Sequence, residues 1–573
     1  RVPQKVHIWQ RFVRNAKVMK FTNFAIALLV TLCHALNGAE SANILSLVEV
    51  LAPDQQIWHD AVIRGLIESG HKVTLVSGST MHSKSPHLTQ IHLEQVKEAL
   101  DTTINRHSRL VNAWLNPFER IYHWYNKQMK VCQAVLSSTG LHELIALSRG
   151  SGMEAPFDVI IFDATYGHSC LLALTQLFEH VPIVAVSASH ITPDLLQVVP
   201  GTQLQPATVP HFTSTHDEHM NFFARLHNTL VYAAAQFFRQ FTVLRVQEAL
   251  LARHEALQAA HVKPTFESVH DRVKVALVNS HPAFDYVHSL PPNVIQVAGL
   301  QFDNINRPLL VEMQTFIDDS IEGVFVITIG AELLTPVLIE QVLSVVDKFP
   351  EFGFVWGVKK IMIPSTGRKN LYVGKWLKKS NILAQNKVIG VITSGSHMEV
   401  QEAIYHGVPI IAVTNTLQPP SIATRVQSLG IGLRVDLKSG AEKLQSAISA
   451  LATKPQFTEN VKSRQVAFRN RPQNPLEEAL WWIEHVMEHP KESDCLHSQA
   501  VVETSFFALH SLDAMSVLLF MLVMFLVNTF IVLKQLREQC QAKGKKTAMN
   551  GVDKEKILKR KTKKTNNNKK KVQ

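Results

Sequence analysis

The sequence predicts an α/β protein of two doubly wound domains followed by a C-terminal transmembrane helix. Three observations lead to this fold class. The chain has 573 residues, more than one hydrophobic core usually serves, so at least two domains are expected. Apolar runs of strand length alternate with helix-like stretches, which favours parallel sheets covered by helices. An uncharged run, residues 514–533, is long enough to cross a bilayer.

The first half of the body, residues 42–290, is expected to form one of these domains. Its strand-length runs are bounded by Gly, Pro or Ser and lie at Ile44–Leu51, Lys72–Val76, Phe157–Phe162 and Val181–Val186. A polar and aromatic insertion, residues 197–253, is expected to be largely helical. In a two-domain protein such an insertion would shape a ligand pocket.

A Pro-containing linker, residues 291–308, is expected to lead into a second domain at residues 309–495. The strand-length runs of this domain lie at Gly323–Ile329, Phe352–Val358, Val388–Thr393, Val408–Val413 and Gly432–Val435. The series closes with an amphipathic helix at Pro475–His489. Its apolar stripe comprises Leu476, Leu480, Ile483 and Val486.

The N-terminal segment, residues 1–41, combines an upstream extension with the pattern of a secretory signal peptide. Met19 and Lys20 precede an apolar run at Phe24–Leu36, and small residues follow near Gly38. The mature body is therefore expected to begin close to Glu40 and to lie in an oxidising lumen.

The C-terminal segments predict how the chain is anchored. A juxtamembrane stretch, residues 496–513, precedes the transmembrane helix at 514–533, and a basic, low-complexity tail follows at 534–573. Because basic residues favour the cytosolic side, a single-pass type I protein with a lumenal body and a disordered cytosolic tail is expected. Lys570 and Lys571 resemble the dilysine retrieval signal of the endoplasmic reticulum membrane; a solvated lysine run is the alternative reading.

Charge and cysteine content exclude some classes of protein. The tail has 15 Lys or Arg and 3 acidic residues, which leaves 43 basic and 44 acidic residues in the rest of the chain. A nearly neutral body argues against nucleic-acid binding. Cys132, Cys170 and Cys495 face the lumen, where at most one pair can form, and the sequence does not say which. No spacing typical of a metal site is found.

The most informative pattern lies at residues 375–435. This segment reads KWLKKSNILAQNKVIGVITSGSHMEVQEAIYHGVPIIAVTNTLQPPSIATRVQSLGIGLRV. It resembles, without gaps, the animal UDP-glycosyltransferase pattern KWLPQ…HGG…EAIYHGVP…DQ…N. APDQQIWHDAVIRGLIESGHKVT resembles the opening helix of insect members, and VNSHPAFDYVHSLPPNVIQVAGL resembles their domain junction. The resemblance covers nearly the whole body.

This resemblance implies the GT-B architecture, in which an N-terminal acceptor-binding domain and a C-terminal UDP-sugar-binding domain face a cleft. It implies inverting transfer of a hexose or glucuronate from a UDP-sugar to small lipophilic acceptors, an activity associated with detoxification. No cofactor is implied beyond the donor substrate. Association with other family members is left open.

The resemblance also places the acid–base residues. In the family, a His of the first domain is the base for the acceptor hydroxyl, and an Asp steadies it. Gln55 stands at the position of that His, and an amide cannot take up a proton near neutral pH. Asp163 matches the Asp. His59, one helical turn after Gln55, and His168, shortly after Asp163, are the candidates for a substitute base.

Nine positions correspond to the family's donor site. They are Thr328, Gly330, Trp376, Thr393, Ser394, Gly395, Ser396, Glu402 and Gln418. In the family, the HGG and the following helix N-terminus hold the pyrophosphate, and here the triplet is Ser394-Gly395-Ser396. The spacing of Ser396 and Glu399 predicts a capping box that would occupy the amides of that helix start.

Two functions follow from these positions. The first is an active, membrane-bound UDP-glycosyltransferase. The alternative is a catalytically degenerate relative that binds a lipophile or associates with an active paralogue. Changes at the base, phosphate and sugar positions together favour the alternative, while Asp163, Trp376 and Glu402 favour the first.

Overall fold

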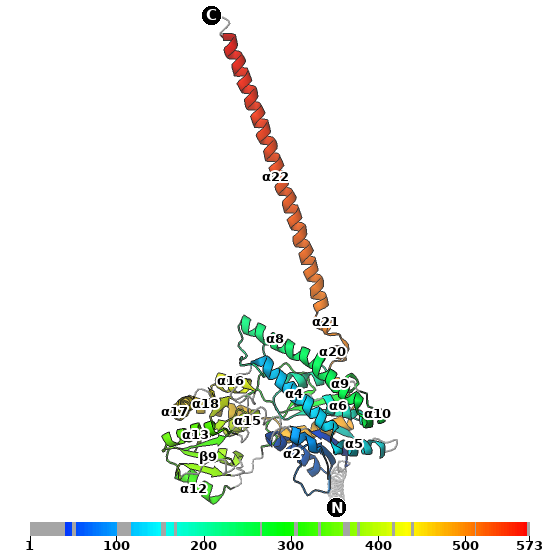
Figure 1. Cartoon of the computed structure of the whole chain (residues 1–573), viewed down its shortest axis with the longest axis vertical. Helices are drawn as coiled ribbons and strands as arrows, with labels where there is room; N and C mark the ends of the chain where they lie inside the picture. The colour runs from blue at the N-terminus through cyan, green and yellow to red at the C-terminus, as the bar shows by residue number, and fades with distance from the viewer. Residues whose placement is uncertain are drawn as a thin grey trace, which may run out of the picture. The chain divides into compact units, whose positions relative to one another are not determined.

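The structure is a computed structural model of the whole chain (Figure 1). It describes residues 41–48, 53–99, 116–150, 156–165, 169–263, 266–302, 308–329, 334–358, 367–374, 379–414, 419–436, 440–509 and 511–569. Several predicted features lie outside these residues: the signal peptide and its upstream extension up to residue 40, His168, Gly330, Trp376, Gln418, Lys570 and Lys571.

The first half of the body forms a seven-stranded parallel sheet of order β3-β2-β1-β4-β5-β6-β7. Its strands are β1 (Asn43–Val48), β2 (Lys72–Ser77), β3 (Leu88–His92), β4 (Val159–Asp163), β5 (Ile183–Ser187), β6 (Val273–Val278) and β7 (Val294–Gln296). Alternate residues of β1 enter two different cores, Leu45 and Leu47 in one and Ile44 and Val48 in the other. Both faces of the sheet are therefore covered, as near-continuous apolar strands require.

Helices cover this first sheet on both sides. They are α2 (Pro53–Glu68), α4 (Pro117–Leu136), α5 (Thr139–Gly150), α6 (Ser169–Leu174), α7 (Pro193–Val198), α8 (Phe222–Phe238), α9 (Leu244–Arg253), α10 (Glu255–Ala259) and α11 (Glu267–His270). Two short turns, η1 (Thr175–Leu177) and the π-helical η2 (Arg239–Val243), join some of them. The insertion at 197–253 is helical from Phe222 onward, as expected.

The second half forms a six-stranded parallel sheet of order β10-β9-β8-β11-β12-β13. The strands are β8 (Val324–Thr328), β9 (Gly353–Gly357), β10 (Leu371–Gly374), β11 (Val388–Thr393), β12 (Ile410–Thr414) and β13 (Gly432–Asp436). Its helices are α12 (Val311–Asp319), α13 (Pro336–Lys348), α14 (Lys379–Leu383), α15 (His397–His406), α16 (Pro420–Ser428), α17 (Ala441–Thr453) and α18 (Pro455–Arg469). The two parallel sheets with helices between their strands confirm the predicted fold class.

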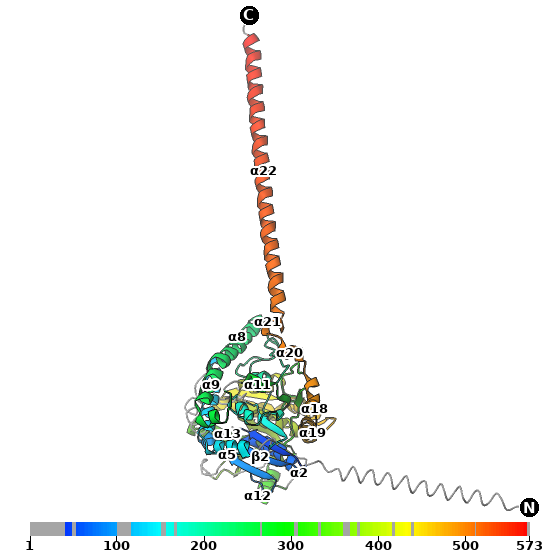
Figure 2. The same cartoon turned by 90° about the vertical axis from the view of Figure 1, so that its right-hand side faces the viewer.

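Two segments differ from the expected division of the chain. The region expected as a linker, residues 291–308, contains β7, which pairs with β6 and closes the first sheet. The last amphipathic helix, α19 (Pro475–Glu488), packs on α2, β4 and β6 of the first sheet rather than on the second (Figure 2). Its Ala479, Ile483 and Val486 complete the core around Trp58. Burial of this apolar stripe explains why the chain returns from the second half to pack α19 on the first sheet.

A disulfide fastens the helical side of the first half. Cys132 of α4 is bonded to Cys170 of α6, with 5.7 Å between the Cα atoms. Cys495 in the short turn η6 (Glu492–Leu496) is free and exposed. Of Cys132, Cys170 and Cys495, the pair that forms is therefore the one whose helices pack together.

The C-terminal unit, residues 498–573, consists of α20 (Gln499–Glu503), α21 (Phe506–Leu509) and the long helix α22 (Leu512–Lys569). The predicted membrane-spanning run lies within α22, which is apolar enough to cross a bilayer. The expectation of a disordered tail was wrong, because α22 continues through residues 534–569. Lys, Arg, Glu and Gln are good helix formers, and Glu555 pairs with Lys559 one turn later.

Candidate functional site

The predicted acid–base residues lie at the carboxyl edge of the first sheet. Gln55 is in the first turn of α2, which follows β1, and Asp163 is the last residue of the adjacent β4. Both side chains are buried. Parallel strands bring their carboxyl ends to the same edge, so the topology places these two residues, distant in the chain, at one edge of the sheet.

Asp163 has a histidine partner, His59. The Nε2 atom of His59 lies 3.4 Å from Oδ2 of Asp163, while Oδ1 accepts a hydrogen bond from the amide of Thr165 at 2.9 Å. Burial raises the pKa of Asp163, but His59 and the hydrogen bonds from Thr165 outweigh burial and hold that pKa below its ordinary value of 3.8. Asp163 is therefore an ionised carboxylate, and His59 is 3% exposed beside it.

The predicted donor positions lie at the carboxyl edge of the second sheet. Thr328 ends β8 and Thr393 ends the neighbouring β11. Ser394, Gly395 and Ser396 then form the turn into α15. Gly395 has φ +78°, a left-handed conformation that glycine adopts without strain, so the chain can reverse between strand and helix.

The helix start in this turn carries an internal carboxylate. Glu399 of α15 accepts hydrogen bonds from the hydroxyls of Thr393 at 2.5 Å and Ser394 at 3.3 Å, and it forms an ion pair with Lys379 of α14. Glu399 is 7% exposed. A carboxylate in the first turn also interacts favourably with the positive end of the helix dipole.

The capping box predicted from Ser396 and Glu399 was wrong. Ser396 is the N-cap residue of α15, but its side chain makes no capping hydrogen bond. The Glu399 carboxylate is instead held by Thr393, Ser394 and Lys379, which precede the helix in the chain. Charge-assisted bonds to a lysine and two hydroxyls are stronger than a neutral cap, which explains the preference. Glu402, one turn further along α15, is partly buried.

A cavity lies where the two halves of the body meet. It has about 490 Å³ of unoccupied space, including its opening to solvent. Residues from the first half, such as Phe212 and Tyr232, and residues of α16, such as Ile422, form its mostly apolar wall. The mostly apolar lining suits a small, largely apolar molecule.

One wall of the cavity is polar. His397, the first residue of α15, places Nε2 at 2.7 Å from Oδ1 of Asp285, whose Oδ2 accepts from the amide of His281 at 2.8 Å. Burial raises the pKa of Asp285, but His397 and the hydrogen bond from the His281 amide lower it by more than burial raises it. The pKa of Asp285 therefore lies below its ordinary value. In the neutral imidazole, Nε2–H donates to Asp285 and Nδ1 is left as an acceptor.

A second histidine approaches from the first half. The rings of His190 and His397 lie 5.5 Å apart, and Nδ1 of His190 lies 3.1 Å from the Ser189 hydroxyl. Burial, together with His397, lowers the pKa of His190 to about 3, so its imidazole is neutral. Nε2 of His190 and Nδ1 of His397 are buried and have no hydrogen-bond partner among the described residues.

Arg425 of α16 lines another side of the cavity, and its charge is paired with an acidic residue of the same chain. Its Nη1 lies 2.9 Å from Oε1 of Glu218, its Nε donates to the Phe284 carbonyl at 2.9 Å, and its guanidinium lies 4.6 Å from the ring of Tyr286. Arg425 therefore joins the two halves and is not a free cation for an acidic ligand.

The sequence predictions did not single out His190, Asp285 or Arg425. Each comes from a different element, and no short motif unites them. The only signal is the segment containing Asp285, which resembles a domain junction of the family. The distances above appear only once both halves are folded.

Comparison with known proteins places the chain in a family. Residues 47–548 match the profile of the family described as UDP-glucoronosyl and UDP-glucosyl transferase. Similar proteins include UDP-glycosyltransferase UGT5 of Dactylopius coccus, 23% identical over 86% of this chain and 92% of that protein. Another is UDP-glucuronosyltransferase 2B33 of Macaca mulatta, 26% identical over 86% of this chain and 93% of that protein.

Solved structures agree on the fold. The calicheamicin glycosyltransferase CalG4 superposes with a TM-score of 0.51 and 14% identity over 79% of this chain and 100% of that chain. The glycosyltransferase VinC, solved in complex with DTDP, gives a TM-score of 0.51 and 15% identity over 78% of this chain and 99% of that chain. The architecture is GT-B, and the chain belongs to the UDP-glycosyltransferase family.

Proposed function

We propose that this chain is a catalytically degenerate member of its family. It binds a small, hydroxyl-bearing lipophile in the cavity between its halves and does not carry out conventional sugar transfer. The observation that carries this proposal is the Glu399 carboxylate, bonded to Thr393, Ser394 and Lys379 at the start of α15.

The position of Glu399 disfavours a nucleotide diphosphate. The resemblance assigns this strand-to-helix turn to the donor pyrophosphate, and Glu399 already supplies the negative charge that the helix start stabilises. Two like charges 4 Å apart repel by about 4 kcal/mol at an effective dielectric constant of 20, and the ammonium of Lys379 offsets part of this repulsion. A remainder of roughly 1.4 kcal/mol corresponds to a tenfold loss of affinity.

The acid–base position supports the same proposal. Gln55 cannot accept a proton from an acceptor hydroxyl, and losing a general base typically costs about 10²–10⁴-fold in rate. His59 is the nearest titratable substitute, but its Nε2 faces Asp163 and its side chain is buried. The general-base position and the donor-site positions, which lie in different halves of the body, thus both differ from the family pattern.

The cavity supports ligand binding without catalysis. Its apolar wall provides burial, and Nδ1 of His397 provides an acceptor for one hydroxyl donor. A ligand hydroxyl would satisfy a buried nitrogen that otherwise lacks a partner, and a hydrogen bond of this kind contributes about 1 kcal/mol. A phenol or a similar lipophilic alcohol fits both requirements.

Calorimetric titration of the full chain in detergent tests this proposal. We expect naphthol to bind several-fold more tightly than its methyl ether, which lacks the O–H donor, and we expect UDP to bind weaker than micromolar. His397→Leu should remove the preference for naphthol, because leucine has no acceptor, whereas the exposed His82→Leu should retain it. Micromolar UDP affinity, or equal binding of naphthol and its methyl ether, would contradict the proposal.

A second candidate is an active enzyme that transfers hexose or glucuronate to lipophilic acceptors with inversion. The His59–Asp163 pair favours it, because a histidine next to an ionised carboxylate has the composition of a general base. Incubation of microsomes with radiolabelled UDP-sugars and a phenol panel separates the candidates. Product that disappears in His59→Gln would support the enzyme.

For the cell, we infer a single-pass type I protein of the endoplasmic reticulum membrane, with the body lumenal and residues 534–573 cytosolic. The apolar helix α22 and the basic residues that follow support this orientation. Protease protection of sealed microsomes tests it: a tag after residue 573 should be digested while the body is protected.

A further inference from the structure

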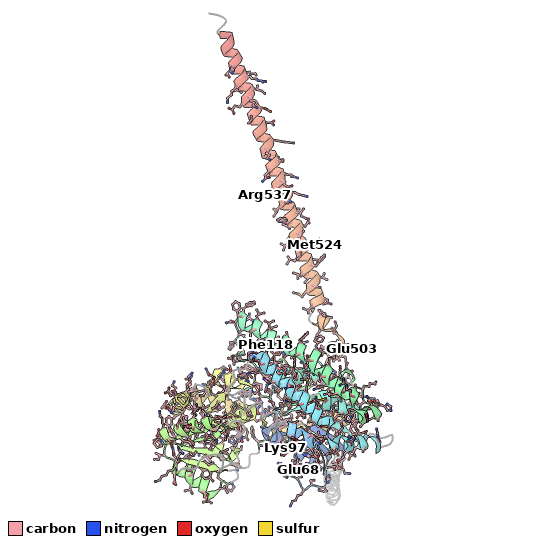
Figure 3. All side chains as sticks on the ribbon, viewed as in Figure 1. Glu68, Lys97, Phe118, Glu503, Met524 and Arg537 are labelled. Atoms are coloured by element: carbon pink, nitrogen blue, oxygen red, sulfur yellow. A yellow bond between two sulfur atoms is a disulfide. The ribbon has the colours of Figure 1, made fainter. Side chains whose placement is uncertain are left out.

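A row of exposed apolar side chains follows the outer side of α8 and η2. Phe223 is 77% exposed, Phe237 65% and Phe241 59%. On the neighbouring helix α4, the ring of Tyr122 lies 6.2 Å from that of Phe238 (Figure 3 labels Phe118 on the same helix). We refer to these residues as the α8 face: Phe118, Tyr122, Phe222, Phe223, Leu226, Leu230, Phe237 and Phe241.

The α8 face is not needed for the core of the body. The opposite side of α8 is already buried through Val231, Tyr232 and Ala235. On the helices of the second sheet the large exposed apolar residues are scattered, as with Val337 of α13 and Val466 of α18. Isolated apolar residues are ordinary on a protein surface, whereas a contiguous aromatic row marks an interaction site.

The charges around the α8 face suit a lipid surface. Residues 221–247 contain no Asp or Glu, and on α4 the exposed Glu119 lies next to Phe118. Arg225 and Arg245 are exposed toward the two ends of the row. An apolar helix face with Phe and Leu, flanked by arginine and free of acidic residues, is typical of helices that lie in the membrane interface.

A short segment also tethers the body to the helix that is apolar enough to span a bilayer. The body ends at His497, and α22, the helix apolar enough to span a membrane, begins at Leu512. The intervening residues 498–511 extend at most about 50 Å. A tether of this length keeps the body at high effective concentration next to the membrane surface.

We propose that the α8 face lies in the interfacial region of the bilayer that α22 spans, as a second and peripheral membrane contact. The proposal is independent of catalysis and rests on α22 as the anchor. Tyr232 lines the cavity from the inner side of α8. The same helix therefore contacts lipid outside and the cavity inside, which provides lipophilic ligands with a short route from the bilayer.

Controlled release of the body from the anchor tests this contact. The full chain, with a specific protease site inserted after residue 503, is reconstituted in phosphatidylcholine–phosphatidylserine vesicles at about one copy per vesicle and then cleaved. We expect the cleaved body to stay with the vesicles on flotation. In the variant Phe222→Ser/Phe223→Ser/Phe237→Ser/Phe241→Ser the partition coefficient should fall at least about a hundredfold, because each change removes a large apolar side chain.

A matched control changes four exposed apolar residues on or beside the helices of the second sheet: Val311→Ser, Ile321→Ser, Val337→Ser and Val466→Ser. This variant should stay bound. Release of the unaltered body, or equal release of both variants, would overturn the proposal. Retention that appears only at many copies per vesicle would overturn it as well, since it would show that the face binds a second copy of the chain.

Discussion

The hydroxyl of Thr393 donates a hydrogen bond to Oε2 of Glu399 at 2.5 Å, across the turn that joins β11 to α15. This contact closes the strand end onto the first turn of the helix and buries a carboxylate there. Lys379 from the preceding helix forms an ion pair with this carboxylate. The carboxylate of Glu399 therefore occupies the place in this turn where an external anion would bind.

Replacing Glu399 with Gln should improve nucleotide binding. The amide keeps an acceptor for Thr393 and removes the negative charge, so we expect the affinity for UDP to rise at least about tenfold. Calorimetry of the full chain measures the change. Glu442→Gln, in the exposed first turn of α17, is the matched control and should have no effect. An unchanged affinity in Glu399→Gln would show that another feature excludes UDP.

Restoring both family histidines should restore some turnover. Gln55→His supplies a base beside Asp163, and Ser394→His supplies the residue that the family uses at the phosphate. We expect the double variant to transfer radiolabelled sugar to phenols at least about a hundredfold faster than the unaltered chain. Adding Asp163→Asn should abolish the gain. If the double variant stays inactive, the other donor-site substitutions matter more than these two.

Stability should rise with pH through the range set by His211. Burial, with a smaller effect of His190, lowers the pKa of His211 to about 3, below its ordinary value of 6.5. Between these values the unfolded chain binds a proton that the folded chain does not, so the free energy of unfolding decreases as the pH falls. His211 contributes up to about 1.4 kcal/mol per pH unit to the slope of the free energy of unfolding against pH.

Chemical denaturation from pH 6.5 to 4 measures this slope in the unaltered chain and in His211→Gln. We expect a shallower slope in the variant, because glutamine does not titrate and can still reach the hydroxyl of Thr213, which lies 2.7 Å from Nδ1 of His211. The exposed His82→Gln should leave the slope unchanged. A parallel slope in His211→Gln would show that this histidine does not resist protonation in the folded state.

Removing the disulfide should destabilise the first half of the body. Cys132→Ser/Cys170→Ser opens a link between residues separated by 38 positions, and we expect a loss of about 2–4 kcal/mol. Thermal unfolding with and without reductant measures the loss. Cys495→Ser, at a free and exposed cysteine, should unfold like the unaltered chain. Equal melting of the double variant would mean that the bond adds no stability.

The sequence by itself determined the two-sheet architecture and the apolar C-terminal helix. Central strands such as β4 and β11 are buried on both faces, so their apolar runs are visible without any knowledge of partners. The strands that escaped prediction are β3, β7 and β10, which lie at the edges of the two sheets, and β6, an interior strand to which the edge argument does not apply. Edge strands bury less surface, so their hydrophobic pattern is weaker.

Only the tertiary structure decided which side chains meet. The sequence spacing of Ser396 and Glu399 suggested a local cap, but Lys379 and Thr393 compete for the same carboxylate in the folded chain. Likewise His397 and Asp285 belong to different halves, and their 2.7 Å contact exists because the halves pack together. Local patterns determine strands and helices through burial, whereas charge pairing depends on distances that only folding sets.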